Sequence, residues 1–277
     1  MIKDPYKFDF DANGVLALTE DNIFRINFII DNDSNYRLSS DIENTKSVAR
    51  YVADRRNTLP WSKDELLHII TEIDRQNSTH QDSTGVKKDD STSKNNGGRE
   101  KTAEYIYNIH NLYARLEAGD PSLVNDIAKA LYKEEGGGRY TFSFASKFCT
   151  YVSQALYDSD KYCIYDRVVS DVLPYYAWAY LGDDSCFARS KSKISRIFGI
   201  DDNNGDYAVY RLLIDKIRKR NEELTGYLIS RKDFDHLLWY YFKGDYDQKD
   251  KETKRVLHIS RTTEALRHIR KDSAILK

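Results

Sequence analysis

Apolar residues recur every three or four positions along most of this chain, a pattern typical of amphipathic helices that predicts a mainly α protein. The segment 142–157 shows the pattern best, because nearly all of its apolar side chains fall within one arc of a helical wheel. Lys147 falls outside that arc beside Tyr151, so we expect it at the rim of the buried face. Similar spacing predicts further helices over 62–73, 102–118, 121–131, 166–173, 190–200, 207–224, 231–242 and 262–269.

Residues that begin and end helices support these ranges. Ser62 and Glu65 have the spacing of a capping box at the start of one helix. The Gly-Asp-Pro sequence at 119–121 ends one helix and begins the next. Asp166 is placed to cap the helix that follows it, and we expect Pro174 to bend or end that helix.

Changes in composition divide the chain into four parts. Residues 1–76 form an N-terminal segment expected to pack on the core, and within it the apolar run 23–30 fits either a strand or a buried helical turn. Residues 77–101 are rich in Ser, Thr, Asn, Asp, Lys and Gly, which predicts a flexible polar loop. Residues 102–242 hold the helical core, and residues 243–277 form a basic helical extension.

Composition and charge narrow the class of protein. Of the 277 residues 40% are hydrophobic and 31% are charged, which is typical of a folded domain. No apolar run is long enough to span a bilayer, we see no secretory signal, and three cysteines favour a reducing compartment. The net charge of −1 combines +7 over residues 187–277 with −8 elsewhere. A basic half is consistent with a polyanionic partner and equally with an uneven solvated surface.

Motifs for metals and nucleotide cofactors are absent from the sequence. The six histidines are scattered, and neither a CxxC pair nor an HExxH motif occurs, so we expect no metal. Neither GxxxxGK[ST] nor GxGxxG occurs, so we expect no cofactor. The remaining candidate chemistry is a lysine and an acid at the starts of successive helices, Lys147 and Asp166, 19 residues apart.

Around these two residues the chain resembles a known family. The stretch 141–173 is similar to the core of the helix-hairpin-helix DNA glycosylase superfamily, in particular its 8-oxoguanine glycosylase (OGG) branch and a set of prokaryotic OGG-fold proteins. Residues 143–147 match the lysine-bearing hairpin of that superfamily, and residues 164–169 match its aspartate segment at the same spacing. Phe234–Trp239 match a helix near the end of the prokaryotic proteins. The hairpin glycines are replaced, here by Ser143 and Ala145.

The resemblance implies a helical bundle like the helix-hairpin-helix DNA glycosylase fold, with a divergent N-terminal segment. It implies excision of a damaged or modified base that is flipped out of duplex DNA. The neutral amine of Lys147 would attack the sugar C1′ to form a Schiff base, which can progress to strand cleavage (AP lyase activity), and Asp166 would stabilise the positive charge on the sugar. We assign DNA binding to Ser143, Ala145, Gly138, Arg139, Arg189, Lys191 and Lys193, and the base pocket to Phe144, Tyr151, Tyr165 and Trp239.

Three other functions stay open. The chain fits a catalytically inactive OGG-fold protein that binds DNA, because the hairpin glycines are missing. It also fits a phage-defence protein that acts on modified phage DNA, or a helical interaction protein in which Asp166 is only a cap. We expect double-stranded DNA as partner, no membrane, a monomer, and a prokaryotic cytoplasm with association to the nucleoid. The sequence does not indicate which base is excised.

Overall fold

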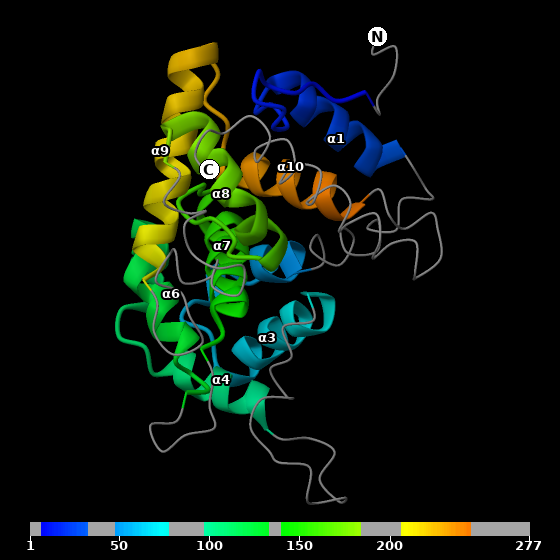
Figure 1. Ribbon diagram of the computed structural model, residues 1–277. Helices are drawn as coiled ribbons and strands as arrows, with labels where there is room; N and C mark the ends of the chain where they lie inside the picture. The colour runs from blue at the N-terminus through cyan, green and yellow to red at the C-terminus, as the bar shows by residue number, and fades with distance from the viewer. Residues whose placement is uncertain (1–6, 33–47, 78–96, 133–139, 184–205, 245–277) are drawn as a thin grey trace, which may run out of the picture. The chain divides into compact units, whose positions relative to one another are not determined.

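The computed structural model describes residues 7–32, 48–77, 97–132, 140–183 and 206–244, and these are mainly helical (Figure 1). The prediction of a mainly α protein is confirmed for these ranges, where an isolated bridge between Phe10 and Leu16 is the one strand-like pairing. None of the described helices is long and apolar enough to cross a membrane. The helices are α1 (Glu20–Asn32), η1 (Arg56–Thr58), α3 (Lys63–Asn77), α4 (Gly98–Tyr107), α5 (Leu112–Ala118), α6 (Pro121–Ala128), α7 (Phe142–Tyr157), α8 (Arg167–Leu181), α9 (Tyr207–Thr225) and α10 (Arg231–Gly244).

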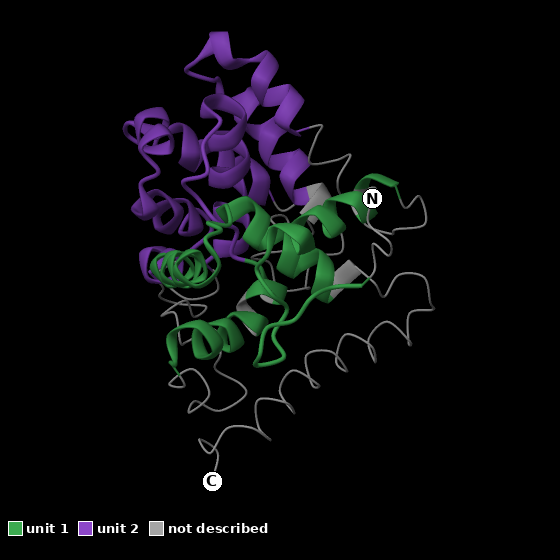
Figure 2. Ribbon diagram, turned by 90° about the horizontal axis from the view of Figure 1, so that it is seen from above, with its two compact units in different colours: residues 1–40, 166–197, 212–277 green, residues 41–165, 198–211 purple. Residues whose placement is uncertain are grey.

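The chain forms two compact units, each built from separate stretches of sequence (Figure 2). Unit 1 comprises residues 1–40, 166–197 and 212–277, and unit 2 comprises residues 41–165 and 198–211. This division differs from the expected domains, because the expected core 102–242 contributes to both units. The expected domains followed changes in composition along the sequence, whereas the units are defined by contacts between segments that are distant in sequence.

In unit 2, α3 and α4 pack against each other. α3 begins with the predicted capping box: the Glu65 carboxylate accepts a hydrogen bond from the Ser62 backbone N–H at 2.9 Å, and the Ser62 hydroxyl accepts one from the Glu65 backbone N–H at 3.3 Å. An ion pair of 2.9 Å joins Arg99 on α4 to the buried carboxylate of Asp74 on α3. Because α4 begins at Gly98, the predicted polar loop is too long at this end, and its central part lies outside the described residues.

The turn from α5 to α6 has the predicted form. Gly119 ends α5 in the left-handed conformation with φ of 71°, and a Cβ added there would lie 2.5 Å from the Cβ of Lys161, so only glycine fits. Asp120 caps α6 by accepting a hydrogen bond from a backbone N–H of its first turn at 2.9 Å. Arg115 binds Asp120 and Asp126 at 2.7 Å each, which ties α5 to α6.

The central helix of unit 2 is α7, which packs against α3, α5 and α6. Its bounds agree with those that the apolar spacing predicts. Two free cysteines are buried in this unit, Cys149 on α7 and Cys163 in the loop that follows. Burial raises the pKa of the Cys149 thiol well above its ordinary value, so this thiol stays protonated.

Unit 1 contains α1, α8, α10 and most of α9, with α10 packing on both α1 and α8. The run 23–30 belongs to α1, so the helical alternative is correct. A short turn precedes this helix and is held by the buried side chain of Asn22. Its amide donates hydrogen bonds of 2.8 Å to the carbonyls of Asp9 and Ala17, and it accepts one of 2.9 Å from the Asp9 N–H.

Pro174 does not end its helix, because α8 continues through it to Leu181. Two tyrosines beyond the proline fix the second half of α8 within unit 1. The Tyr176 hydroxyl donates to the carbonyl of Leu16 at 3.0 Å, and the Tyr180 hydroxyl accepts from the N–H of Leu18 at 3.4 Å. These contacts and the burial of both rings stabilise the helix past the lost backbone hydrogen bond.

Candidate active site

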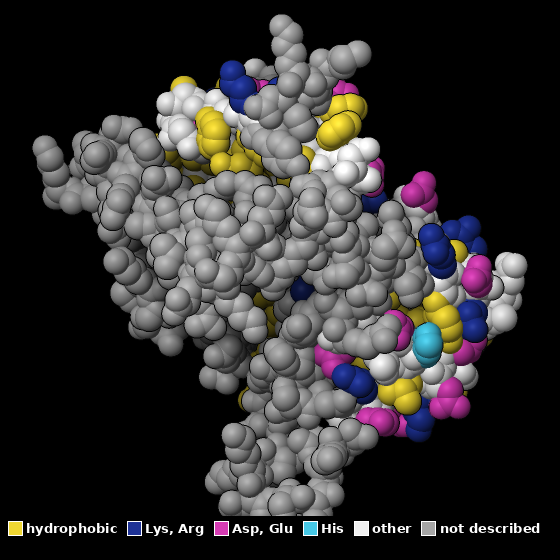
Figure 3. All heavy atoms as spheres, turned by 90° about the vertical axis from the view of Figure 1, so that its right-hand side faces the viewer, with side chains coloured by type: hydrophobic (Ala, Val, Ile, Leu, Met, Phe, Trp, Pro, Cys, Tyr) yellow, Lys and Arg dark blue, Asp and Glu magenta, His cyan; other side chains and the backbone are white. Residues whose placement is uncertain are grey.

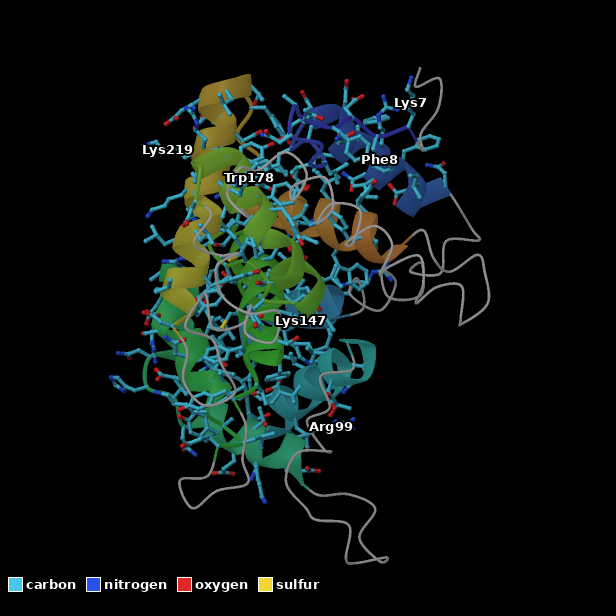
Figure 4. The ribbon with its side chains drawn as sticks, in the orientation of Figure 1. Lys7, Phe8, Arg99, Lys147, Trp178 and Lys219 are labelled. Carbon is cyan, nitrogen blue, oxygen red and sulfur yellow. The ribbon has the colours of Figure 1, made fainter. Side chains whose placement is uncertain are left out.

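Lys147 lies in the second turn of α7 (Figure 4). Only 6% of Lys147 is exposed, so it is buried and the prediction that it lies at the rim of the buried face is wrong. The covered arc is wider than a single face, because three helices of unit 2 pack against α7. The lysine Nζ lies 3.3 Å from Oγ of Ser143, one turn earlier on the same helix. Lysine is among the residues least often buried, which marks this position as a candidate functional one.

The loop that leads to Asp166 is held by three side chains in succession. The Tyr207 hydroxyl accepts a hydrogen bond of 2.8 Å from the N–H of Cys163 and donates one of 2.6 Å to its carbonyl. The Tyr210 hydroxyl donates to the carbonyl of the next residue, 164, at 2.8 Å. Ser146 then accepts from the N–H of Tyr165 at 2.9 Å. Consecutive loop residues are thus fixed to unit 2, and the last is fixed to the residue beside Lys147.

Asp166 follows Tyr165 directly in the chain and is the first residue of its stretch of unit 1. It caps α8 as predicted: its Oδ1 accepts a hydrogen bond from the N–H of Val168 at 2.8 Å. The partial positive charge at a helix N-terminus favours a negatively charged group at this place. Lys147 belongs to unit 2, so the two proposed catalytic residues lie in different units, and one peptide bond connects the anchored Tyr165 to Asp166.

The predicted phosphate-binding hairpin is not formed by residues 143–147. They lie in the first two turns of α7, and the N–H of Ala145 already donates to the carbonyl of Thr141 at 2.9 Å. Ala145 is fully buried, while Ser143 is partly exposed. A continuous helix replaces the hairpin because the glycines that would open the backbone are absent. Gly138, Arg139, Arg189, Lys191 and Lys193 lie outside the described residues.

The four aromatic residues assigned to the base pocket differ in burial. Phe144 is 1% exposed and packs 6.2 Å from the ring of Phe148, so it belongs to the core of unit 2. Tyr151 and Tyr165 are partly exposed on the same unit, and the Tyr165 ring meets that of Tyr210 edge-on at 5.2 Å. Trp239 is partly exposed and lies on α10 in unit 1. Of the four assigned residues, Tyr151 and Tyr165 are therefore the ones in unit 2 with exposed surface left for stacking.

Helix α10, which carries Trp239, also contains His236, a histidine whose pKa is shifted from its ordinary value. Burial, and to a smaller extent the nearby Lys232, lower the pKa of His236 to about 4 against the opposing effect of Asp233. The unfolded chain takes up a proton near pH 6.5 but the folded chain only near pH 4. The contribution of neutral His236 to stability is therefore complete above pH 6.5 and is lost as the pH falls toward 4.

We expect acidification from pH 6.5 to pH 4 to lower the free energy of unfolding by about 1–3 kcal/mol through His236. Other groups titrate in this range, so the measurement is the difference between the wild type and His236→Gln in urea unfolding at each pH. Glutamine stays neutral, and the pH dependence of that variant should be flatter. Parallel pH profiles for the two proteins would show that His236 does not contribute.

The residues that fix the loop could not be identified from the sequence. Tyr207 and Tyr210 are three apart at the start of α9 and share a face of that helix, a signal that is visible. Their target, the loop at 163–164, is more than forty residues away, and nothing in the sequence links them.

Within the described ranges, no three His, Cys, Asp or Glu side chains converge where they could hold a metal ion.

Comparison with known proteins adds one similarity. A family model described as HI_0787_N, N-terminal domain, matches residues 62–156. This stretch runs from the capping residue of α3 to the last turn of α7, so it contains Lys147 and ends before Asp166. Comparison with curated proteins and with solved structures found no match to the chain.

Proposed function

We propose that this protein is a DNA glycosylase that excises a damaged or modified base from duplex DNA through a Schiff base on Lys147. The observation that carries the proposal is the burial of Lys147, which is 6% exposed with Nζ held 3.3 Å from Ser143. The resemblance over 141–173 supports the same role for this residue. A buried amine on a helix that packs against three others is held in one place, as nucleophilic attack requires.

The reaction that we propose begins with a nucleotide flipped out of the stack. The lone pair of the neutral Lys147 amine forms a bond to the sugar C1′ while the glycosidic bond breaks and its electrons leave with the base, which takes up a proton. The first amine proton balances the one taken up by the base. The sugar ring then opens: the nitrogen lone pair forms the C1′=N bond as the C1′–O4′ bond breaks, its electrons stay on O4′, and O4′ takes up the second amine proton, which gives the Schiff base. Hydrolysis then returns the lysine and leaves an abasic site. If a C2′ proton is lost first, a C2′=C3′ double bond forms as the 3′ phosphate leaves with the C3′–O electrons, and the strand is cleaved.

Asp166 supplies the negative charge in this proposal. Positive charge grows on the sugar as the base departs, and a carboxylate fixed as a helix cap can stabilise it without reorganising. Ser146 and the two tyrosines of α9 are positioning residues, because they fix the loop that ends beside Asp166. Tyr151 and Tyr165 are the rings of unit 2 that we expect to contact the extruded base.

Trapping with sodium borohydride tests the proposal, because hydride reduces a Schiff base to a stable secondary amine. The protein is incubated with duplexes that each carry one oxidised, alkylated or phage-type modified base, and adducts are separated on a denaturing gel. We expect a covalent adduct with the wild type and none with Lys147→Gln. Lys129→Gln, which removes a half-exposed lysine of unit 2, is the matched control and should be trapped like the wild type.

The same panel separates the second candidate function. The N–H of Ala145 is used within α7, so one phosphate contact of the family is missing, and this favours a protein that binds DNA without excising a base. Such a protein would bind the duplexes in a salt-dependent manner and give no adduct with any of them. Trapping that survives in Lys147→Gln would show that another nucleophile forms the adduct.

A further inference from the structure

Helix α1 carries a row of exposed side chains that combines aromatic rings with carboxylates. Asp21, Phe24, Phe28 and Asp31 are all exposed, and their spacing of three and four residues places them along one face. We call these four residues the α1 stripe. The two rings, of Phe24 and Phe28, are 56% and 43% exposed. Figure 3 shows hydrophobic side chains at the surface of the face that it views. Adjacent exposed rings with a polar border are typical of an interaction surface.

The charges of the α1 stripe limit what can bind to it. Carboxylates at both ends repel the phosphates of nucleic acid, so the stripe does not fit DNA. A second copy fits poorly too, because two-fold pairing would place the same acidic ends against each other. A helix of 13 residues also offers far less than the roughly 800 Å² per partner of a stable dimer. The stripe fits a basic partner with a few apolar side chains.

The C-terminal residues of this chain have that composition. Residues 251–277 contain eight Lys and Arg against three Asp and Glu. Within the predicted helix 262–269, Leu266 and Ile269 are three apart and share a face. Arg267 and Arg270 follow them directly in the sequence. The pattern of two apolar residues with neighbouring cations complements two rings flanked by carboxylates.

The chain is long enough to bring this segment to α1. α10 packs against α1 and ends at Gly244 in the same unit. The eleven residues 245–255 can span up to about 36 Å when extended, at roughly 3.3 Å each. α1 itself is only about 20 Å long, at 1.5 Å per residue. Docking within one molecule therefore needs no strained connection, and the tether keeps the local concentration of the segment high.

We propose that residues 256–271 dock on the α1 stripe of the same molecule, with Leu266 and Ile269 against Phe24 and Phe28. The arginines beside them then lie near the carboxylates at the two ends of the stripe. The inference does not depend on the proposed enzymatic activity, because it concerns only unit 1.

Hydrogen exchange on the full chain, followed by mass spectrometry, tests the docking. We expect peptides covering 262–270 to exchange about tenfold faster in Phe24→Ser/Phe28→Ser than in the wild type, because loss of the rings undocks the segment. Both rings are exposed, so the fold should persist. The control Leu224→Ser/Leu228→Ser removes two other exposed apolar side chains of unit 1, which are 58% and 49% exposed, and it should leave this exchange unchanged.

A charge exchange tests the orientation of the contact. Asp21→Lys/Asp31→Lys should accelerate exchange at 262–270, and adding Arg267→Glu/Arg270→Glu should restore the slow exchange. Restoration by a second set of changes cannot come from damage to the fold. Equal exchange in the wild type and in the Phe24→Ser/Phe28→Ser protein would overturn the proposal. Protection that disappears on dilution would also overturn it, because the occupant would then be a second copy.

Discussion

Asp166→Asn is expected to slow base excision by about 10²- to 10⁴-fold while the fold keeps nearly its full stability. Asparagine caps a helix as well as aspartate does, so the hydrogen bond to the N–H of Val168 is retained. The substitution removes only the negative charge that we assign to stabilising the sugar as the base leaves. The rate is measured in single-turnover excision on the duplex that gives the strongest borohydride adduct, and stability by urea unfolding.

Asp206→Asn is the matched control for this prediction. Asp206 precedes α9 and accepts a hydrogen bond of 2.9 Å from the N–H of Ala208, two residues on, as Asp166 does at α8. It has no part in the proposed site, so its variant should excise at the wild-type rate. If Asp166→Asn also excises at that rate, Asp166 acts only as a cap and the proposed mechanism loses its acid.

Tyr207→Phe is expected to lower the free energy of unfolding by about 2–4 kcal/mol. The hydroxyl is fully buried and holds both the N–H and the carbonyl of Cys163, and phenylalanine removes these two buried hydrogen bonds. Burial raises the pKa of this hydroxyl well above its ordinary value, so it remains a donor at any accessible pH. Urea unfolding of both proteins measures the difference.

The loop held by Tyr207 leads to Asp166, so the same substitution should also reduce the single-turnover excision rate. Tyr157→Phe serves as comparison, because Tyr157 is partly exposed and its hydroxyl makes a bond of 3.3 Å to the carbonyl of Tyr113. We expect that variant to lose less than about 1 kcal/mol and to keep its rate. A Tyr207→Phe protein as stable as the wild type would show that the loop is not anchored by this hydroxyl.

Local signals in the sequence were sufficient for much of the helical structure. The bounds of α7, the capping box at Ser62 and the turn at Gly119 each depend on residues within one or two helical turns, and all three are confirmed. The run 23–30 stayed ambiguous because apolar β-branched residues fit both a strand and a buried helix. Burial of Ile23, Ile26 and Ile29 at a spacing of three residues decides it.

Features that depend on contacts between distant segments could not be predicted. A helical wheel contains no information on how many neighbours cover a helix, so it placed Lys147 at a rim although three helices pack around α7. Pro174 has a local tendency to end a helix that is overcome by hydrogen bonds from α8 to residues far away in the sequence. The roles of Lys147 and Asp166 remain predictions, which the variants Lys147→Gln and Asp166→Asn test.

The two buried thiols allow the opening kinetics of unit 2 to be measured without introducing new cysteines. Cys149 is 0% exposed and Cys163 is 2% exposed, so alkylating reagents can reach either only when the unit opens. Pulses of such a reagent, followed by digestion and mass analysis of the two peptides, would report the opening rate at the centre of α7 and at the anchored loop separately. Repeated with duplex DNA present, the pulses would show which of the two places a bound nucleic acid makes more rigid.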